Sequence, residues 1–404
     1  MTLFRQEKTI NTFRTILVIA LVATASGCTT LKSWMHKAGA SDNIHEPAAL
    51  VKITPAISVQ RLWSRSTGKG ERMLGLREHP AIADGRVYVV DSYGANLTAL
   101  DLVSGRDIWK TNTKLRLTGG PGVGSGSVVV GSVNGDVVAF AADTGVERWR
   151  MKLSSEILST PLVAGNIVIV RTGDGHVVAM DLADGKRRWA FEHALPTLSL
   201  RGNPSPILGG NGLVYLGYED GTLVALRAQD GVKAWEQVVA QPEGRSELDR
   251  MADIDGDVVV SPDGIYAASY KGKIAAFSPD TGNPMWEHSL VSYSGLARGG
   301  DTLYASDAVG TVWAIDHASG GALWKQDALG YRWLSEPAVQ DGYVVVGDLQ
   351  GYLHWMRADS GAIVAREKIG GRNDAIRGTP QVSADGILVA ETVKGKLAAF
   401  RIGK

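Results

Sequence analysis

A repeated motif constrains the fold of this chain more than any other feature. The motif begins at a glycine, continues through an apolar run to a second glycine about ten residues later, and ends four residues after that at a tryptophan. The copies begin at Gly94, Gly135, Gly175, Gly221, Gly272, Gly310, Gly351 and Gly395. Six of them end in a tryptophan, and these tryptophans are 40, 40, 46, 51 and 38 residues apart. Periods of this length are typical of propellers and solenoids.

Each repeat predicts four short strands. Alternating or wholly apolar runs, such as residues 86–90 and 127–130, are bounded by Gly and Asp, which is typical of strands between tight turns. We expect an inner strand near Pro121 or Pro161, two central strands, and an outer strand that ends at the tryptophan. The Asp-Thr-Gly and Asp-Gly elements suit hairpin turns, because glycine adopts a positive φ without strain.

The number of repeats predicts how the ring closes. Seven copies are complete, while the eighth, from about residue 377 to 402, lacks its outer strand. Residues 59–63, which end in Trp63, can supply that strand from the other end of the chain. We therefore predict an all-β fold over residues 58–404, an eight-bladed β-propeller of four-stranded antiparallel blades without a long free edge.

The recurring tryptophans are predicted to dock neighbouring blades together. Each blade of a propeller buries its faces only against the next, and one tryptophan buries about 150–250 Å². A ladder of tryptophans that binds a ligand is the alternative. The last complete copy departs from the pattern, with Ala365 in the tryptophan position and Trp355 nearby. The predicted docking residues are Trp63, Trp109, Trp149, Trp189, Trp235, Trp286 and Trp324.

The first 27 residues are predicted to be a signal peptide. Three basic residues precede an apolar core at 16–23, which is too short to span a bilayer. Small residues then lead to Cys28, the one cysteine in the sequence. This arrangement resembles a bacterial lipoprotein signal, in which Cys28 would carry the lipid, although Ala25 stands where Leu is usual. Thr29 in place of Asp favours the outer membrane by the same resemblance, and residues 28–57 are predicted to be the lipidated cysteine and a flexible tether. An ordinary signal peptide with a chance cysteine is the alternative.

Composition excludes several functions. The sequence has 42 basic and 42 acidic residues, and removal of residues 1–27 leaves 39 and 41, which argues against nucleic-acid binding. One cysteine excludes an internal disulfide and a Cys-based zinc site. No HxH, HExxH or GxSxG pattern is present. The acidic run from Asp249 to Asp257 resembles a calcium loop, but Val258 and Gly264 stand where the required Gly and Glu should be. We therefore expect no metal and no cofactor.

Two connections between repeats are longer than the others. The distance from the tryptophan to the next inner strand is 12 residues after Trp109 and Trp149, but 17 after Trp189 and about 22 after Trp235. Connections from outer to inner strands emerge on one face of a ring, and these two follow successive blades. We therefore expect them to be neighbours and to form a binding surface, with two idle loops as the alternative.

The repeat resembles the tryptophan-docking repeat of quinoprotein propellers, which two families share. The PQQ-dependent dehydrogenases are larger and usually carry a vicinal cysteine pair, which this sequence cannot form. The BamB family, the lipoprotein propellers of the outer-membrane β-barrel assembly machinery, is similar over almost the whole mature chain. Three local strings agree with it, at residues 198–202, 247–255 and 347–355.

The resemblance to BamB implies a function and a set of binding residues. In that family the Leu-x-Leu-Arg and Asp-x-Asp strings bind the periplasmic domains of the barrel insertase BamA. They correspond here to Leu198, Leu200 and Arg201, and to Asp253 and Asp255, which lie in the two long connections. The expectation is a non-enzymatic scaffold, lipid-anchored at the periplasmic face of the outer membrane, that assists insertion of β-barrel proteins. Contact with unfolded outer-membrane proteins is left open, and a quinoprotein dehydrogenase or an extracytoplasmic sensor of small ligands are the alternatives.

Overall fold

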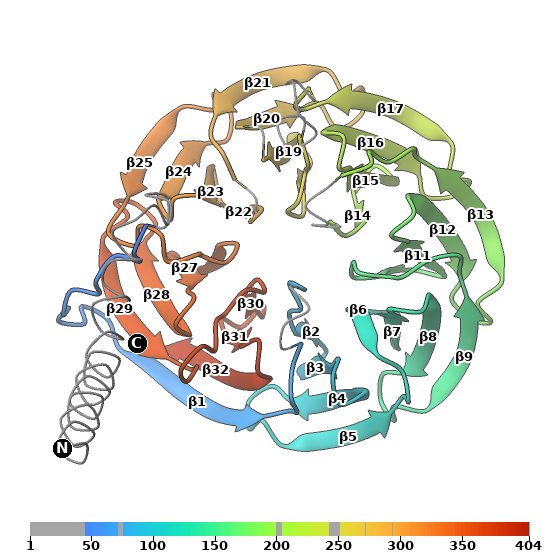
Figure 1. Cartoon of the computed structure of the whole chain (residues 1–404), viewed down its shortest axis with the longest axis horizontal. Helices are drawn as coiled ribbons and strands as arrows, with labels where there is room; N and C mark the ends of the chain where they lie inside the picture. Colours follow the sequence, from blue (N-terminus) through green and yellow to red (C-terminus); the bar gives the residue numbers. More distant parts are fainter. Residues whose placement is uncertain are drawn as a thin grey trace, which may run out of the picture. The chain divides into compact units, whose positions relative to one another are not determined.

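The computed structural model describes residues 45–71, 76–198, 204–241, 251–270, 272–292 and 294–403. By its contacts the chain divides into two units, Met1–Pro47 and Ala48–Lys404. The described residues of the first unit are 45–47, which form no helix or strand. Over its described residues, the second unit is a ring of eight four-stranded β-sheets (Figure 1).

The eight sheets are the blades of a propeller, and all of their strand pairs are antiparallel. Blades 1 to 4 are made of β2 (Ala81–Ala83), β3 (Arg86–Asp91), β4 (Asn96–Asp101) and β5 (Asp107–Asn112); β6 (Leu117–Gly124), β7 (Ser127–Ser132), β8 (Asp136–Ala141) and β9 (Glu147–Lys152); β10 (Leu162–Ala164), β11 (Ile167–Arg171), β12 (His176–Asp181) and β13 (Arg187–Glu192); and β14 (Ile207–Leu208), β15 (Leu213–Gly217), β16 (Thr222–Arg227) and β17 (Lys233–Val238).

The remaining blades continue around the ring. Blades 5 to 8 are made of β18 (Val259–Ser261), β19 (Gly264–Ser269), β20 (Lys273–Phe277) and β21 (Pro284–Ser289); β22 (Leu296–Gly299), β23 (Thr302–Ser306), β24 (Val312–Asp316) and β25 (Ala322–Gln326); β26 (Ala338–Gln340), β27 (Tyr343–Gly347), β28 (Tyr352–Arg357) and β29 (Ile363–Lys368); and β30 (Gln381–Val382), β31 (Leu388–Glu391), β32 (Lys396–Ile402) and β1 (Val59–Ser66).

The predicted closure of the ring is confirmed. Strand β1 pairs with β32 from Val59 opposite Ile402 to Ser66 opposite Lys396, with a shift of register between Arg61 and Trp63. Blade 8 therefore takes three strands from the end of the chain and one from its beginning, as the missing outer strand of the last repeat predicts. This pairing covers the edge of β32, which would otherwise be free to pair with other chains.

The position of a strand in its blade explains its sequence. All five side chains of β11 are buried, because a central strand is covered on both faces by neighbouring blades. In the outer strand β13, by contrast, Trp189 is the one buried side chain and the rest are exposed or half-buried. Continuous apolar runs therefore mark the central strands, and the lone tryptophan marks the outer one.

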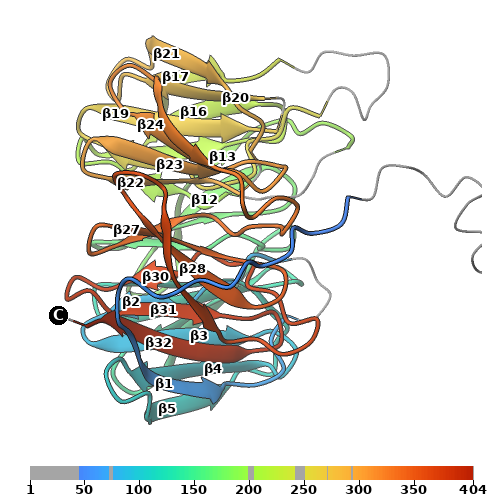
Figure 2. The same cartoon turned by 90° about the vertical axis from the view of Figure 1, so that its left-hand side faces the viewer.

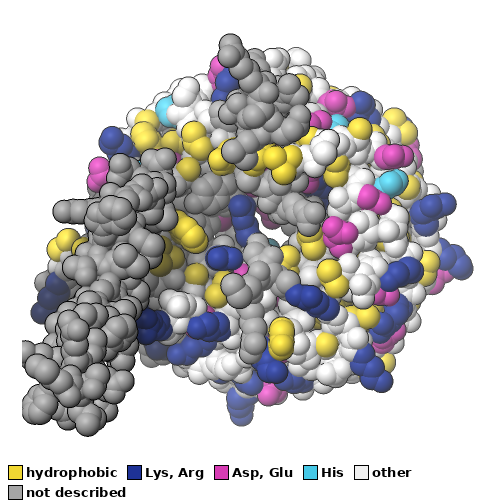
Figure 3. Space-filling model, in the orientation of Figure 1, with side chains coloured by type: hydrophobic (Ala, Val, Ile, Leu, Met, Phe, Trp, Pro, Cys, Tyr) yellow, Lys and Arg dark blue, Asp and Glu magenta, His cyan; other side chains and the backbone are white. Residues whose placement is uncertain are grey.

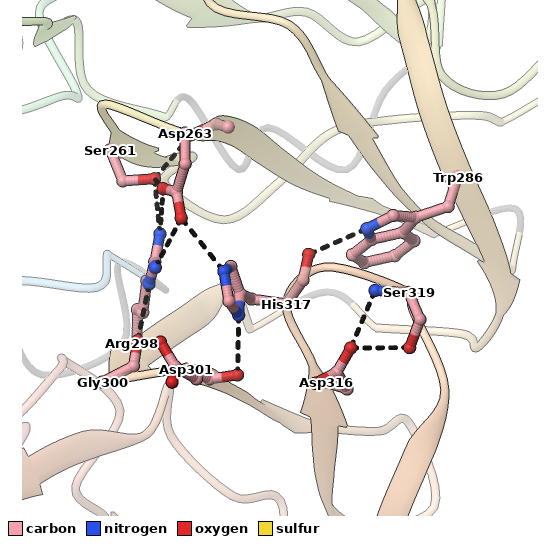
Figure 4. Close-up of polar contacts among 10 residues, drawn as sticks. Ser261, Asp263, Trp286, Arg298, Gly300, Asp301, Asp316, His317 and Ser319 are labelled. Atoms are coloured by element: carbon pink, nitrogen blue, oxygen red, sulfur yellow. Dashed lines mark hydrogen bonds and ion pairs between the residues drawn. The ribbon is translucent and has the colours of Figure 1, made fainter.

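Seven tryptophans dock onto the following blade in the same way. The indole N–H of Trp189 donates to the carbonyl of Ala228 at 2.9 Å, and its ring lies against Gly231, which has a φ of 73°. The other six donate to Leu102, Ala142, Leu182, Pro279, His317 and Ala358. Figure 4 shows this bond for Trp286 and His317, beside the Asp316–Ser319 contact that shapes the receiving turn. Trp63 follows the same scheme.

A tyrosine on the second strand reinforces this docking in three blades. In blade 4 the Tyr215 hydroxyl donates to the carbonyl of Pro279, the same oxygen that accepts the indole N–H of Trp235. Tyr88 and Tyr304 make the equivalent bonds to Ala142 and Ala358. Each of these pairs therefore joins two blades through one shared acceptor.

The contact between blades 7 and 8 uses a different device. Ala365 occupies the usual tryptophan position, and Trp355 is fully buried on β28 instead. The Trp355 indole N–H donates to Gln340 Oε1 at 2.8 Å. Gln340 in turn donates to the carbonyls of Gly386 and Phe400 in blade 8. A buried amide thus replaces the direct bond from tryptophan to the next blade.

Residues 48–57, which we call the strap, run along blades 6 and 7 before β1 begins. The amide of Ala48 donates to Gly330, and the amide of Ala56 donates to Val364, both at 2.8 Å. Within the predicted tether of residues 28–57, this part is therefore hydrogen-bonded to the propeller. The predicted signal peptide, Cys28 and the rest of the tether up to residue 44 lie outside the described residues.

A buried polar network beneath the strap explains the string at residues 347–355. Asp348 Oδ2 accepts from Arg332 Nε at 2.8 Å and lies 2.9 Å from His354 Nε2. Arg366 Nε donates to His354 Nδ1, so the His354 proton is on Nε2 and faces Asp348. Burial lowers the pKa of His354, which keeps the ring neutral. The two arginines also hold the strap, since they donate to the carbonyls of Ala48 and Val51.

Candidate functional site

One face of the ring carries the long connections, and we call it the loop face. It is formed by the turns between the two central strands of each blade and by the connections from each outer strand to the next inner strand. In Figure 2 the loop face lies on the right-hand side, opposite the C-terminal end of the chain. The connection β13–β14 (residues 193–206) joins blade 3 to blade 4, and the connection β17–β18 (residues 239–258) joins blade 4 to blade 5. We call these two connections together the two-loop surface.

The two long connections are neighbours, as the sequence predicts. The amide of Ser205, at the end of the first, donates to Asp257 Oδ1, at the end of the second, with a distance of 2.6 Å. This contact ties the entry of blade 4 to the entry of blade 5.

Both connections also rest on the turn between β15 and β16. His193 begins the first connection, stacks on Tyr218 with ring centres 4.0 Å apart, and places Nε2 2.8 Å from Asp220 Oδ2. The amide of Ile254, in the second connection, donates to the carbonyl of Tyr218. Although burial opposes it, hydrogen bonding to His193 and Thr222 holds the pKa of Asp220 below its usual value. One turn of blade 4 therefore supports both parts of the two-loop surface.

A buried ion pair fixes this turn to the preceding blade. Arg171, at the end of β11, pairs with Glu219, and the two side chains are 1% and 5% exposed. The same guanidinium donates to the carbonyl of Gly217 and lies over the Tyr218 ring. Burial raises the pKa of Tyr218, so its hydroxyl stays protonated. If either partner moved away, the other would remain as an unpaired buried charge, which is costly. The pair therefore holds the turn against blade 3.

The structure describes three of the five predicted binding residues, and these three differ in exposure. Leu198 is exposed at 43% of its surface, as expected of a residue that contacts a partner. Leu200 and Arg201 lie outside the described residues. Asp253 and Asp255 are buried, at 0% and 3% exposure, so the expectation that they face a partner does not describe the free chain. Their backbones hold the second connection in place, because the carbonyls of Asp253 and Asp255 accept from Tyr270 N and Arg77 Nη1.

The contact between Arg77 and Asp255 crosses the axis of the ring. Arg77 precedes blade 1 and Asp255 precedes blade 5, which lie on opposite sides of an eight-bladed ring. A cavity of about 50 Å³ lies there, and residues from seven of the eight blades line it, among them His79, Ser159 and Glu336. Pockets for small ligands usually measure about 300–1,000 Å³. The cavity therefore has room for a few water molecules and is smaller than such a pocket.

Three carboxylates gather between blades 8 and 1, beside a cavity of about 10 Å³. Burial raises the pKa of Glu71 to about 8, against a smaller opposite effect of Arg377. Burial also raises the pKa of Glu78 to about 8 and that of Glu391 well above its usual value. These groups are therefore largely protonated at neutral pH, and their chemistry concerns the stability of the ring closure.

In the part of the chain that the structure describes, no group of three or more His, Cys, Asp or Glu side chains, the three carboxylates between blades 8 and 1 included, is placed so that it could hold a metal ion. In the same residues no helix is long and apolar enough to cross a membrane. The described part of the acidic run, residues 251–257, thus holds no such cluster, and the buried Asp253 and Asp255 belong to the packing of the loop.

Some residues of the site could not be recognised from the sequence. Arg171 and Glu219 lie in different blades, and neither belongs to a repeated position that would have indicated a pair. Tyr218 occupies a turn that most other repeats fill with small or polar residues, which is the one signal that a search for departures from the repeat could have used.

Comparison with known proteins agrees with the architecture. A family model described as outer membrane protein assembly factor BamB matches residues 94–326 and 308–404. A relative of that name from Xanthomonas campestris pv. campestris is 41% identical over 409 residues, covering 98% of this chain and 100% of the relative. The crystal structure of BamB from Moraxella catarrhalis has a TM-score of 0.77 and 28% identity, covering 85% of this chain and 100% of that chain.

An enzyme shares the fold at much lower identity. The quinohemoprotein alcohol dehydrogenase from Pseudomonas putida HK5 has a TM-score of 0.70 and 14% identity, covering 86% of this chain and 77% of that chain. At this identity the likeness concerns the fold alone.

Proposed function

The chain belongs to the BamB family of outer membrane protein assembly factors, and we propose that it is a scaffold that binds the periplasmic domains of the barrel insertase BamA. It contributes no chemical step. Its part is to hold the insertase in a productive arrangement while outer-membrane β-barrel proteins fold and insert.

The two-loop surface carries this proposal. Leu198 exposes 43% of its surface on a connection whose base is fixed by the His193–Asp220 and Ser205–Asp257 contacts. An exposed leucine on a rigid base is suited to a protein partner, because little conformational entropy remains to be lost on binding. Leu200 and Arg201 follow in the same connection, and Arg201 supplies a cation for a carboxylate or carbonyl of the partner.

Asp253 and Asp255 have a supporting part in this proposal. Since both side chains are buried in the free chain, they take part in the packing of the second connection. Asp253→Ala and Asp255→Ala keep the backbone carbonyls but empty the space of a buried side chain, so they are expected to lower insertase binding and thermal stability together, unlike a residue that contacts the partner directly.

Capture of the insertase tests the proposal. The full mature chain, extracted from envelopes in mild detergent, is expected to bring the insertase with it, and Arg201→Ala is expected to weaken this capture at an unchanged melting temperature. Lys114→Ala is the control, because Lys114 is an exposed cation on another connection of the loop face. Loss of stability without loss of capture in Arg201→Ala would assign Arg201 to the fold.

We further propose that Cys28 is acylated and anchors the chain to the outer membrane from its periplasmic side. Family membership supports an association with this membrane, and the sequence around Cys28 supports the lipid. Cys28→Ser is expected to abolish labelling by a radioactive fatty acid. It is also expected to release the chain from the membrane when the chain is not held there by binding to the insertase. Retained labelling would contradict the assignment of Cys28.

A further inference from the structure

Four exposed apolar residues follow one another along the loop face, and we call them the apolar arc. Tyr270, Val291, Val309 and Trp333 are exposed at 37%, 41%, 47% and 63%. They lie in four successive connections of the loop face, between β19 and β26. Figure 3 looks onto this face and shows hydrophobic side chains over the part of the ring formed by blades 5 and 6.

The arc is continuous with the two-loop surface. The amide of Tyr270 donates to the carbonyl of Asp253, in the second long connection, at 2.9 Å. The turn that follows Tyr270 is joined to the next connection by the amide of Leu290, which donates to the carbonyl of Gly272. Further along, the amide of Ala308 donates to Val291, and the amide of Tyr331 donates to Val309. A chain of backbone hydrogen bonds therefore joins the two-loop surface to the residues around Trp333, so a partner on the first surface also lies beside the arc.

The backbone at Trp333 is fixed in an unusual conformation. Tyr331 and Trp333 have φ values of 56° and 50°, in the left-handed region that residues with large side chains rarely adopt. Arg332 lies between them, is 2% exposed, and donates to Asp348 Oδ2, Gln350 Oε1 and the Ala48 carbonyl. With Arg332 held inside the blade, Trp333 is directed to solvent. Strain of this kind persists where a position is tightly constrained, and it is frequent at functional sites.

A tryptophan in this setting is suited to binding a protein. Tryptophan is enriched among the residues that dominate interface energetics, and its rigid ring loses little entropy on binding. The docking tryptophans lie between blades, where their indole N–H groups are hydrogen-bonded to carbonyls of the next blade, as Trp324 is to Ala358. Trp333 is not needed for that purpose, because Trp324 docks blade 6 onto blade 7.

We propose that the apolar arc, with Trp333 as its main anchor, extends the insertase-binding surface from the two long connections to blade 7. This inference rests on the proposed function, because it assigns a second contact with the same partner. A single partner then spans blades 4 to 7 of the loop face, with polar contacts at the two-loop surface and apolar contacts along the arc.

Titration of the full mature chain with the purified periplasmic domains of the insertase tests this. Trp333→Asn is the informative variant, because asparagine tolerates the left-handed backbone while removing the ring. Its dissociation constant is expected to rise at least about tenfold at an unchanged or higher melting temperature. Val309→Ser, which does not disturb the strained segment, is expected to weaken binding by a smaller factor.

Tyr93→Asn is the matched control. Tyr93 is an aromatic residue of the loop face, 54% exposed, in the β3–β4 turn of blade 1 and outside the arc. Its variant is expected to bind like the wild type. If wild type does not bind the insertase domains, the proposed function fails. If wild type binds and Trp333→Asn and Val309→Ser bind equally well, the function stands and the arc is excluded. If the arc variants lose binding to phosphatidylglycerol vesicles but still bind the insertase domains like the wild type, the proposal is also overturned, because the arc then contacts a membrane surface.

Discussion

Each docking tryptophan acts together with one glycine of the following blade. The Gly231 φ of 73° is unfavourable for other residues, and a Cβ at this position would overlap the Trp189 ring. The glycine is thus required twice, once for the turn and once for the approach of the indole. The contact joins the second glycine of one repeat to the tryptophan of the repeat before it.

Gly231→Ala is therefore expected to destabilise the propeller more than a change that disturbs the turn alone. Gly212→Ala in the same blade is the control, because Gly212 has a φ of 77° but no atom within 4 Å of the place where a Cβ would stand. Both variants carry the backbone strain of about 1 kcal/mol, and Gly231→Ala is expected to cost about 1–3 kcal/mol more through the clash. Urea unfolding measures the difference, and equal losses would show that the tryptophan contact is unimportant.

The pKa of Glu71 gives a second prediction for single residues. Burial raises it from 4.5 to about 8, so between these pH values the folded chain keeps a proton that the unfolded chain releases. The contribution of protonated Glu71 to the free energy of unfolding is fully present below pH 4.5. As the pH rises to 8 this contribution is lost, by up to about 1.4 kcal/mol per pH unit. Glu71→Gln cannot lose a proton. Its stability relative to wild type is expected to rise between pH 5 and 8 in urea unfolding, and a constant difference would contradict the assignment.

The N-terminal part of the propeller adds two elements to the ring, the strap and strand β1, and the sequence indicates one of them. Strand β1 could be predicted because its tryptophan completes a counted pattern. The strap could not, because its bonds join backbone groups of residues 48–57 to Arg332 and Arg366, which are distant in the sequence and belong to no repeated position. For the same reason Gln340 could not be foreseen as the link between blades 7 and 8. Ala365, which departs from the repeat, indicated only that the contact between blades 7 and 8 lacks the usual docking tryptophan.

Nested truncations are expected to separate these two elements. Removal of residues 1–44 leaves the strap and β1, and should leave stability unchanged. Removal of residues 1–57 takes away the bonds to Ala48, Val51 and Ala56 and is expected to lower stability slightly. Removal of residues 1–66 also takes away Trp63 and the partner of β32, and is expected to cost at least about 4 kcal/mol more. Equal unfolding curves for the last two chains would contradict closure by β1.

The whole molecule presents two unlike faces. The loop face carries the two-loop surface and the apolar arc, while the opposite face carries short, regular hairpin turns. The spacing between repeats located the two long connections, because added length is visible in a sequence. Spacing could not reveal the arc, whose members lie in four different connections, nor the burial of Asp255, which depends on Arg77 from the opposite side of the ring. The apolar arc and the burial of Asp255 both depend on contacts between distant parts of the chain, and a local sequence pattern does not indicate such contacts.

Hydrogen–deuterium exchange of the full mature chain, with and without the insertase's periplasmic domains, tests the account most directly. Bound insertase is expected to slow exchange in the connections 193–206 and 239–258 and around Tyr270, Val309 and Trp333. Exchange in the turns 101–107, 141–147 and 181–187, on the opposite face, is expected to stay the same. Protection confined to those opposite turns, or no protection anywhere at saturating insertase, would contradict the claim that this propeller binds its partner through the loop face.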